Sequence, residues 1–599
     1  MGDPASDAAA YKAAKEAWVT GHTGGSMMEV TIVTASSLTS FILWAYTQKY
    51  LASSPSNGLM RAASKRAKRQ IRFGIYSFIV DFLTLIVPPL LSITLFADHP
   101  YYWAATILFA AILIRHLLGP SDDLILKKDR KQFKWRDSDD ELSMSDDEES
   151  DAKKESVVGS TTATDLDAQD QEGIRRRNTH ASVEFDGATT GVDASMDPAD
   201  DGGGSRKDSG PTKPPVQRHK IFLSAYRAGM MLLTCIAILA VDFPVFPRRF
   251  SKVEVYGSSL MDLGVGSFVF SSGVVSARGY LKKEKLPFTS QMWMAIRTSI
   301  PLLILGFARL VATKGVEYQE HVTEYGMHWN FFFTLGFLPI FVTLFRSLAD
   351  HVRFSVVGIS IACLYQIFLY YGLEDYIQNA PRVDLISMNK EGIFSFAGYL
   401  SIFLMGIDVG LYVLPNDPYF FSKRKITNKK PKKGKLAMIL VSLLFLLSMG
   451  FLISYGILRI PVSRQMANLS YFFWVITFNT GFILAFLLVE INLTKDEPSA
   501  AAIARAEAKA SLSTSTDKRQ RLQSTVRLPP LTCPPLLEAI NRNGLAIFLV
   551  ANIMTGLVNL SMKTLYAPNV QAVAILTVYT LIISVVAWVW QIMGWRLKL

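Results

Sequence analysis

The chain has 599 residues and a formal net charge of +12; half of its residues are hydrophobic and only 19% are charged. A soluble protein of this length normally carries roughly a quarter charged residues, and here the charges gather in a few segments between long uncharged stretches. This segregation predicts an all-α, polytopic integral membrane protein. The three widely spaced cysteines argue against a disulfide framework or a zinc cluster. Membrane topology explains the positive excess better than nucleic-acid binding does.

Apolar runs along the chain predict the membrane spans. A helix that crosses the bilayer needs about 20 apolar residues, and this criterion predicts about 13 transmembrane helices. The runs 256–277 and 329–345 are the weakest of them. In chain order the predicted spans are 29–47, 71–96, 100–118, 221–241, 256–277, 290–311, 329–345, 354–374, 393–414, 436–459, 471–490, 544–562 and 571–594.

Lysine and arginine predict the orientation. Basic segments follow the first, third, fifth and ninth predicted spans, so all of them lie on one side of the membrane. By the positive-inside rule that side is cytosolic, which makes the N-terminus lumenal and the C-terminus cytosolic. The acidic, Ser- and Gly-rich composition of 119–218 predicts a disordered cytosolic insertion.

The predicted spans and loops divide the chain into five parts. They are the lumenal N-terminus with three transmembrane helices (1–118), the charged cytosolic loop (119–218), the central transmembrane helices with their lumenal loops (219–490), a second cytosolic loop (491–543) and the last two transmembrane helices (544–599).

The loops on the predicted lumenal side mix acidic, His, Asn, aromatic and Pro residues. These loops are 241–254, 316–330, 388–396 and 463–471. Ionisable groups at membrane depth cost free energy unless they are paired or functional. Their concentration on one side predicts a single site there.

The first of these loops, VDFPVFPRRFSK, places an acid and three cations after an apolar span. Asp242 follows that span directly, and two prolines then direct the chain along the interface to Arg248, Arg249 and Lys252. A desolvated carboxylate can act as a base, and a nearby lysine can hold it ionised, bind a phosphate or stabilise an oxyanion. The alternative is that Asp242 caps a helix while the cations reach lipid headgroups.

The second loop has acids and histidines at helical spacing. On a continuous helix five residues share one face: Glu317, Glu320, His321, Glu324 and His328. Such a face can supply a base or a structural hydrogen-bond network. It has no HExxH or other recognised ligand spacing, so we predict no metal.

Two further pairs suggest helix packing. Asn552 and Asn559 lie seven residues apart within a predicted span, share a helix face and are expected to bond across helices. Gly264 and Gly266 indicate close helix packing, or room for a lipid chain between helices.

Several strings together resemble the glycosylphosphatidylinositol (GPI) inositol acyltransferases, the PIG-W family, whose fungal members are GPI-anchored wall protein transfer proteins. The most specific string is AVDFPVFPRRFSKVEVYGSSLMDLGVGSFVFSSGVVSAR (240–278). The others are TGHTGGSMMEV, SAYRAGM, EYQEHVTEYGMHWNFF, NKEGIFSFAGYLSIFL, ANLSYFFWVITFN and NGLAIFLVANIMTGLVNLSM. The resemblance covers nearly all of the membrane part, but not most of 119–218 or roughly 495–530.

The resemblance implies an enzyme of the endoplasmic reticulum membrane. It implies transfer of a fatty acyl group, typically palmitoyl, from acyl-CoA to the inositol 2-hydroxyl of glucosaminyl-phosphatidylinositol. It also implies no cofactor, membrane lipids as the environment, and Asp242 and Lys252 as the catalytic pair. We expect Asp242 to act as general base and Lys252 to orient it or to stabilise the oxyanion.

Other residues of the motif strings are predicted to bind the substrates. The predicted substrate-binding residues are Arg227, Arg248, Arg249, Glu320, His321, Glu324, His328, Trp329, Asn330, Glu391 and Asn468. The predicted acyl-chain tunnel comprises Gly229, Leu263, Gly264, Val265, Gly266 and Phe268. Two alternatives stay open, a membrane acyltransferase with His328 as base and a lipid transporter or flippase.

Overall fold

The computed structural model describes eight segments of the chain, which lie at 4–53, 74–117, 220–281, 287–315, 322–346, 351–415, 433–494 and 531–596. The predicted insertion 119–218 lies outside these described residues. The helices of the described segments, apart from the last residues of α7, belong to one compact unit.

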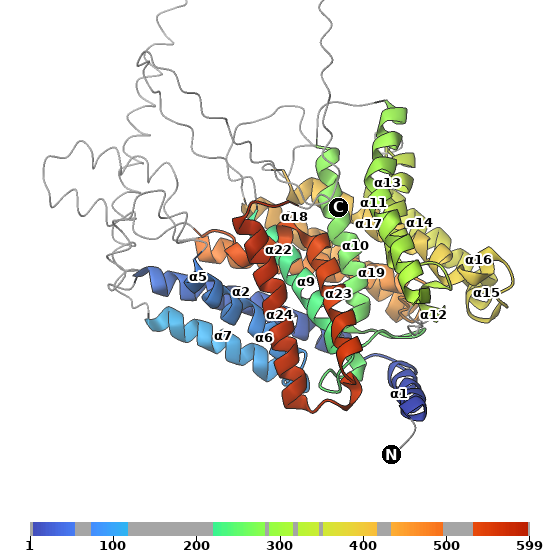
Figure 1. Ribbon diagram of the computed structural model, residues 1–599. Helices are drawn as coiled ribbons and strands as arrows, with labels where there is room; N and C mark the ends of the chain where they lie inside the picture. The colour runs from blue at the N-terminus through green and yellow to red at the C-terminus, as the bar shows by residue number, and fades with distance from the viewer. Residues whose placement is uncertain are drawn as a thin grey trace, which may run out of the picture. The chain divides into compact units, whose positions relative to one another are not determined.

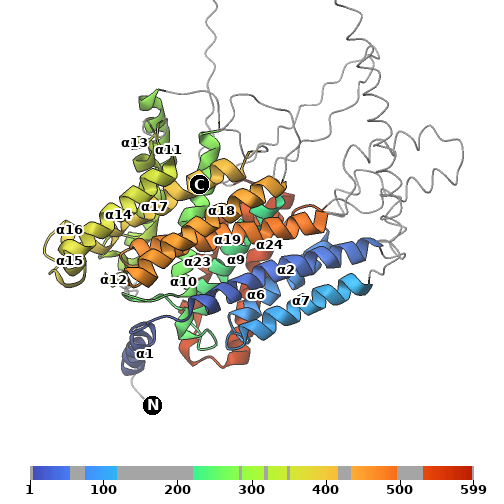
Figure 2. The ribbon, with the colours of Figure 1, turned by 180° about the vertical axis from the view of Figure 1, so that it is seen from behind.

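The described residues form helices and no strand (Figures 1 and 2). The α-helices are α1 (Pro4–Val19), α2 (Met27–Ser53), α5 (Ile75–Asp81), α6 (Val87–Ser92), α7 (Pro100–Leu117), α9 (Ile221–Ala240), α10 (Leu260–Ser276), α11 (Phe288–Gly315), α12 (Val322–Tyr325), α13 (Phe331–Leu344), α14 (Phe354–Phe368), α15 (Glu374–Asn379), α16 (Leu385–Met388), α17 (Lys390–Val413), α18 (Lys433–Phe451), α19 (Leu469–Thr494), α22 (Pro535–Arg542), α23 (Gly544–Ser561) and α24 (Asn569–Ile592). Short 3₁₀ segments are η3 (Arg248–Phe250), η4 (Ala277–Gly279) and η8 (Thr564–Tyr566), and π segments are η2 (Phe82–Ile86), η6 (Leu369–Leu373) and η7 (Leu452–Ile457).

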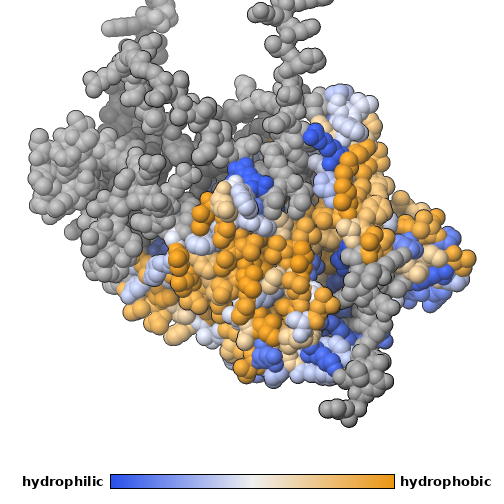
Figure 3. All heavy atoms as spheres, viewed as in Figure 1, coloured by the Kyte–Doolittle hydropathy of each residue, from blue (hydrophilic) through white to orange (hydrophobic). Residues whose placement is uncertain are grey.

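A helix lies on each of the predicted spans, which confirms the all-α polytopic class. Among the described residues, 11 helical segments are long and apolar enough to cross a membrane. The weak span 256–277 is one of them, as α10. The weak span 329–345 contains α13, which has only 14 residues. Side chains on the face in Figure 3 are mostly hydrophobic over the middle of the helices and hydrophilic toward its margins, as a lipid-facing surface requires.

Local sequence explains the interruptions in these helices. The π segment η2 ends at Ile86, two residues before the pair Pro88 and Pro89. A proline lacks the N–H that an α-helix needs and clashes with the preceding turn, so the hydrogen-bond ladder shifts just before it. A second break, at Gly372 in η6, has a φ of 111°, a conformation that glycine adopts without steric cost.

The centre of the unit is built from α9, α10, α17 and α19. The helices α10 and α17 approach closely through glycines, because a Cβ on Gly273 would lie 2.3 Å from the Phe403 carbonyl oxygen. Likewise, a Cβ on Gly406 would lie 2.4 Å from the Phe270 oxygen. Small residues of this kind let membrane helices pack backbone to backbone.

The loops separate into two ends of the helical unit. At one end, here called the motif end, the loops that follow α9, α12, α16 and α18 contact one another, for example through Gly257 N–H to Val462 O and Met327 N–H to Met388 O, and the turn after α9 contacts the end of α23 through Asp242 and Asn559. At the other end, the basic end, Lys220 donates to the Val413 carbonyl. The predicted polar loops thus do meet at one end.

Two elements lie where loops were expected. The helix α1 precedes the first span, within the polar N-terminal stretch. The helix α22 forms within the predicted loop 491–543 and packs against α9 and α24. Four of its eight residues, Leu536, Leu537, Ala539 and Ile540, are buried hydrophobic side chains. The last part of that segment is therefore built into the helical unit.

Candidate functional site

The carboxylate of Asp242 is buried at the C-terminal end of α9. The Asn559 amide nitrogen, from α23, donates a 2.8 Å hydrogen bond to Asp242 Oδ2. Lys15 Nζ, from α1, lies 3.4 Å from Asp242 Oδ1. The expectation that Asn559 bonds across helices is confirmed, whereas Asn552 donates to the Phe548 carbonyl of its own helix.

Arg248 forms hydrogen bonds to the backbone of the loop that contains Asp242. Its Nη2 donates to three backbone carbonyls of that loop, the shortest bond being 2.7 Å to Val241 O. Its guanidinium stacks over the Trp18 ring at 4.2 Å. Burial lowers the pKa of Arg248 to about 10 despite the attraction of Asp242. The Nε and Nη1 atoms are buried and have no hydrogen-bond partner among the described residues, which leaves donors for an anion.

Arg249 is held by two carboxylates. Its Nε lies 2.8 Å from Glu29 Oε1 and its Nη2 lies 2.7 Å from Asp98 Oδ1. Partial burial by itself would lower the pKa of Arg249, but the two ion pairs outweigh burial and raise it. A lipid phosphate at Arg249 would therefore compete with two ion pairs that already exist.

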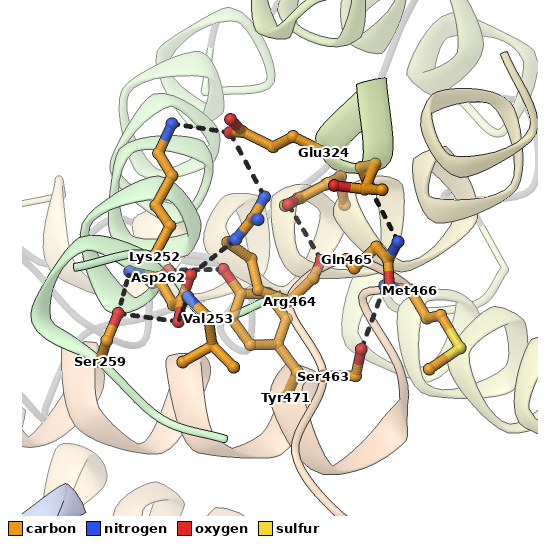
Figure 4. Close-up of polar contacts among 12 residues, drawn as sticks. Lys252, Val253, Ser259, Asp262, Glu324, Ser463, Arg464, Gln465, Met466 and Tyr471 are labelled. Atoms are coloured by element: carbon orange, nitrogen blue, oxygen red, sulfur yellow. Dashed lines mark hydrogen bonds and ion pairs between the residues drawn. The ribbon is translucent and has the colours of Figure 1, made fainter. Parts of the chain in front are cut away.

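Lys252 belongs to a second group of charges, drawn in Figure 4. Its Nζ lies 2.7 Å from Glu324 Oε1. The buried Arg464 lies on the other side of Glu324, with Nη1 at 3.5 Å from the same oxygen, and its Nε lies 2.6 Å from Asp262 Oδ1. Asp262 also accepts bonds from the Ser259 hydroxyl and the Val253 N–H. The four side chains form a chain of alternating charge, Lys252–Glu324–Arg464–Asp262.

Opposite charges dominate the electrostatics of Glu324 and Arg464. Burial by itself would raise the pKa of Glu324, but Lys252 and Arg464 outweigh burial and lower it to about 2. Burial would lower the pKa of Arg464, but Glu324 and Asp262 outweigh burial and raise it. Glu324 and Arg464 are therefore ionised at neutral pH.

Two expectations about this region are corrected. Lys252 was expected either to orient Asp242 or to stabilise the oxyanion, and the contacts do not support the first role, because the described partner of Lys252 is Glu324, and those of Asp242 are Lys15 and Asn559. A continuous helical face was expected through 317–328. In the structure α12 ends at Tyr325 and the next residue is a glycine with a φ of 105°, so Glu324 and His328 do not share a helix face. Glu317, Glu320 and His321 lie outside the described residues.

The residues after α12 form hydrogen bonds mainly with other residues of the chain. Asn389 Oδ1 accepts the backbone N–H groups of His328 and Trp329. The Trp329 indole donates to the Thr334 hydroxyl. Asn330 caps the N-terminus of α13 by accepting two of its N–H groups. His328 Nδ1 is buried without a hydrogen-bond partner among the described residues, so it is the one group of this set free to meet a ligand.

Two other predicted substrate-binding residues also have internal partners. Glu391, at the start of α17, is buried and pairs with Arg382. Asn468 is buried before α19, where its Oδ1 accepts the N–H groups of Ser463 and Tyr471 and its Nδ2 donates to Pro461. These contacts give both residues a role in shaping the motif end.

A cavity lies between α9, α10, α11, α13 and the α22–α23 junction. It has an empty volume of about 1060 Å³, which includes space open to solvent. Its walls are largely apolar, and Arg227, whose Nε donates to the Ser271 hydroxyl, lies among them. The lining residues are Arg227, Met230, Met231, Thr234, Gly264, Ser267, Phe268, Ser271, Ser272, Val275, Ser276, Thr298, Leu302, Leu335, Pro339, Phe403, Ile540, Asn541, Gly544 and Leu545.

The predicted acyl-chain tunnel is only partly in this cavity. Gly264 and Phe268 line it. Gly229 instead faces Ser37 of α2, and a Cβ on Gly266 would lie 2.5 Å from Val475 of α19. Leu263 and Val265 are also absent from the lining. Period 3.6 puts residues 264 and 268 on one helix face, whereas Gly266 packs against α19.

Sequence reasoning missed two of the ionic partners. Lys15 lies in a polar stretch that precedes the first span, where no apolar pattern marks it as part of a site. Arg464 was visible as a cation in the polar loop 463–471, and its cost at membrane depth was a signal that it needs a carboxylate partner. Which carboxylate it binds depends on how the loops fold together.

Comparisons with known proteins match almost the entire chain. The model of the GWT1 family matches residues 11–162 and 192–590. A protein named GPI-anchored wall transfer protein 1 from Gibberella zeae is 34% identical, over 97% of both chains. Proteins with the same name are 36% identical in Aspergillus fumigatus, over 96% of this chain and 97% of the relative, and 35% identical in Yarrowia lipolytica, over 98% and 99%.

Proposed function

Because the chain belongs to the GWT1 family, as its motif strings predicted, we propose that it is an acyl-CoA-dependent O-acyltransferase of GPI-anchor biosynthesis. The proposed reaction moves a palmitoyl group from palmitoyl-CoA to the inositol 2-hydroxyl of glucosaminyl-phosphatidylinositol. The proposed location is the endoplasmic reticulum membrane, with the motif end facing the lumen and the basic end facing the cytosol.

One observation carries the proposal: a single helix, α9, joins a buried carboxylate to an apolar cavity. Arg227, Met230, Met231 and Thr234 line the cavity on α9, and Asp242 follows the helix. Thr234 lies eight residues before Asp242, about 12 Å along a helix. A long acyl chain in the cavity can thus bring its thioester toward Asp242. In an alternative arrangement, a donor that enters from the cytosol has its phosphates at Arg227, near the basic end, and its pantetheine arm, not its acyl chain, along α9.

The chemical step needs one base and one group that stabilises negative charge. The Asp242 carboxylate accepts the proton of the inositol hydroxyl as its oxygen attacks the thioester carbonyl. The new ester C–O bond forms and the C–S bond breaks, and the proton can then pass to the departing CoA thiolate. Lys252 is the cation proposed to stabilise the oxyanion. The unpartnered donors of Arg248 are proposed to hold the acceptor's phosphate.

The test is mass spectrometry of the lipid after incubation of purified protein with palmitoyl-CoA and glucosaminyl-phosphatidylinositol. The wild type is expected to add one palmitoyl group. Asp242→Asn and Lys252→Ala are each expected to abolish transfer without loss of folding, since a general base such as Asp242 contributes roughly 10²–10⁴-fold. Lys252→Ala is expected to melt at a lower temperature, because Glu324 loses one of its two cations. Near-normal transfer by either variant would refute its catalytic role.

The same assay separates the alternatives. A base at His328 requires that His328→Gln loses the single-turnover rate while Asp242→Asn keeps it. A transporter or flippase requires that the lipid crosses the membrane of a proteoliposome without consumption of acyl-CoA. An added acyl chain on the lipid decides for the enzyme.

A further inference from the structure

The N-terminal helix α1 supplies the cation that contacts Asp242. Lys15 Nζ lies 3.4 Å from Asp242 Oδ1 and donates a 3.1 Å hydrogen bond to Asn559 Oδ1. The amide of Asn559 in turn donates to Asp242 Oδ2 at 2.8 Å. The three side chains form a closed ring from α1, the turn after α9, and α23, which are far apart in sequence.

Contacts on both sides hold α1 in this place. The Tyr11 ring meets the Tyr566 ring edge-on at 5.4 Å, which ties α1 to the loop after α23. Trp18 stacks on Arg248, which ties α1 to the loop after α9. Figures 1 and 2 both show α1 beside the motif end of α23.

The segment after α1 is fastened as well. Gly24 and Ser258 form a parallel β-bridge, and a Cβ on Gly24 would lie 2.4 Å from the Ser258 oxygen. The φ of Gly24 is 79°, so a side chain there would be strained as well as too close. The chain on the C-terminal side of Lys15 is thus anchored to the loop that carries Asp242 and Lys252, and Tyr11 on the N-terminal side is anchored to the loop after α23.

We propose that Lys15 is a positioning residue of the active centre, acting through Asp242. This inference rests on the proposed function, in which Asp242 is the base. An ionised carboxylate can accept at about four lone-pair sites, and Lys15 and Asn559 occupy one on each oxygen. The carboxylate is held in one orientation, with the other lone pairs open to the acceptor hydroxyl. Lys252, paired with Glu324, remains a separate cation for the oxyanion.

The test compares Lys15→Met, Lys15→Arg and the control Glu16→Gln in the acyl-transfer assay with full-length protein. Glu16 is exposed on the same helix, and its described hydrogen bond uses only its backbone carbonyl. Lys15→Met is expected to lower kcat by roughly 10²-fold, the cost of a misplaced catalytic group. We expect KM for both substrates to stay near wild type, Lys15→Arg to recover most of kcat, and Glu16→Gln to keep full activity.

Two results would overturn the proposal. If Lys15→Met raises KM and leaves kcat unchanged, Lys15 contributes to binding and does not position the base. If Lys15→Arg is as impaired as Lys15→Met while both melt at a lower temperature, Lys15 only anchors α1. Asp242→Asn, measured in parallel, distinguishes failure of the proposed base from failure of the Lys15 proposal. An active Asp242→Asn refutes the base and Lys15 together, whereas an inactive Asp242→Asn with a fully active Lys15→Met refutes Lys15 alone.

Discussion

Replacing Arg464 by methionine tests whether the alternating charges at the motif end hold the loops together. Arg464 and Asp262 side chains are 3% and 1% exposed, and Arg464 Nε lies 2.6 Å from Asp262 Oδ1. Removing one partner of a buried ion pair costs about 3–5 kcal/mol, because the other charge stays buried without compensation. Asp262 keeps its bonds to Ser259 and Val253, and Glu324 keeps Lys252, so we expect a loss at the lower end, about 3 kcal/mol.

A thiol-reactive dye can measure this loss during heating. Cys235 and Cys533 are buried and Cys363 is exposed, so a Cys363→Ser background makes dye labelling report on unfolding. A loss of about 3 kcal/mol lowers Tm by about 2–4 °C in a chain of this size, because the unfolding entropy grows with chain length. The Tm of Arg464→Lys is expected to lie between those of the wild type and Arg464→Met, since one ammonium cannot bridge two carboxylates as a guanidinium does.

A double variant provides the control for Arg464. Asp262→Asn combined with Arg464→Met removes both charges of the buried pair and should melt above Arg464→Met alone. If Arg464→Met unfolds at the wild-type temperature, the buried pair contributes nothing to stability and the reasoning fails.

Three further predictions follow from single contacts. The folded pKa of Glu324, about 2, lies below its ordinary 4.5. Its ion pairs therefore stabilise the fold by up to about 3 kcal/mol above pH 4.5, and this effect is lost as the pH falls toward 2. Between pH 6 and pH 3 the Tm of Glu324→Gln should fall less than the Tm of the wild type. Gly406→Ala places a Cβ 2.4 Å from a carbonyl oxygen of α10 and should cost about 1–3 kcal/mol, whereas Gly556→Ala, with open space at its Cβ, should not lower Tm. Gly264→Phe fills the cavity and should shift activity toward shorter acyl-CoAs; an unchanged chain-length profile would exclude this cavity as the acyl site.

Hydropathy predicted the spans because a membrane helix must satisfy its own backbone hydrogen bonds, which makes its signal continuous along the sequence. The alternation of apolar spans with polar loops also predicted that the polar loops meet at one end of the helical unit. It did not reveal the partners of the charges, because Asp262 meets Arg464, and Asp242 meets Lys15, across some 200 residues or more. Nor did spacing show that α12 ends at Tyr325, where Gly326 turns the chain. Partner choice is a property of the assembled loops, which hydropathy does not encode.

The separation of Asp242 from Lys252 bears on the proposed mechanism. Each has its own counter-charge, Lys15 for Asp242 and Glu324 for Lys252. Had the two formed one ion pair, substrate binding would have to break it before either group could act. As the structure has them, the base keeps open lone pairs on its carboxylate, and Lys252 has two further N–H donors beyond its bond to Glu324. In the proposed mechanism, the hydroxyl at Asp242 and the developing oxyanion at Lys252 would therefore each meet a group that keeps its counter-charge.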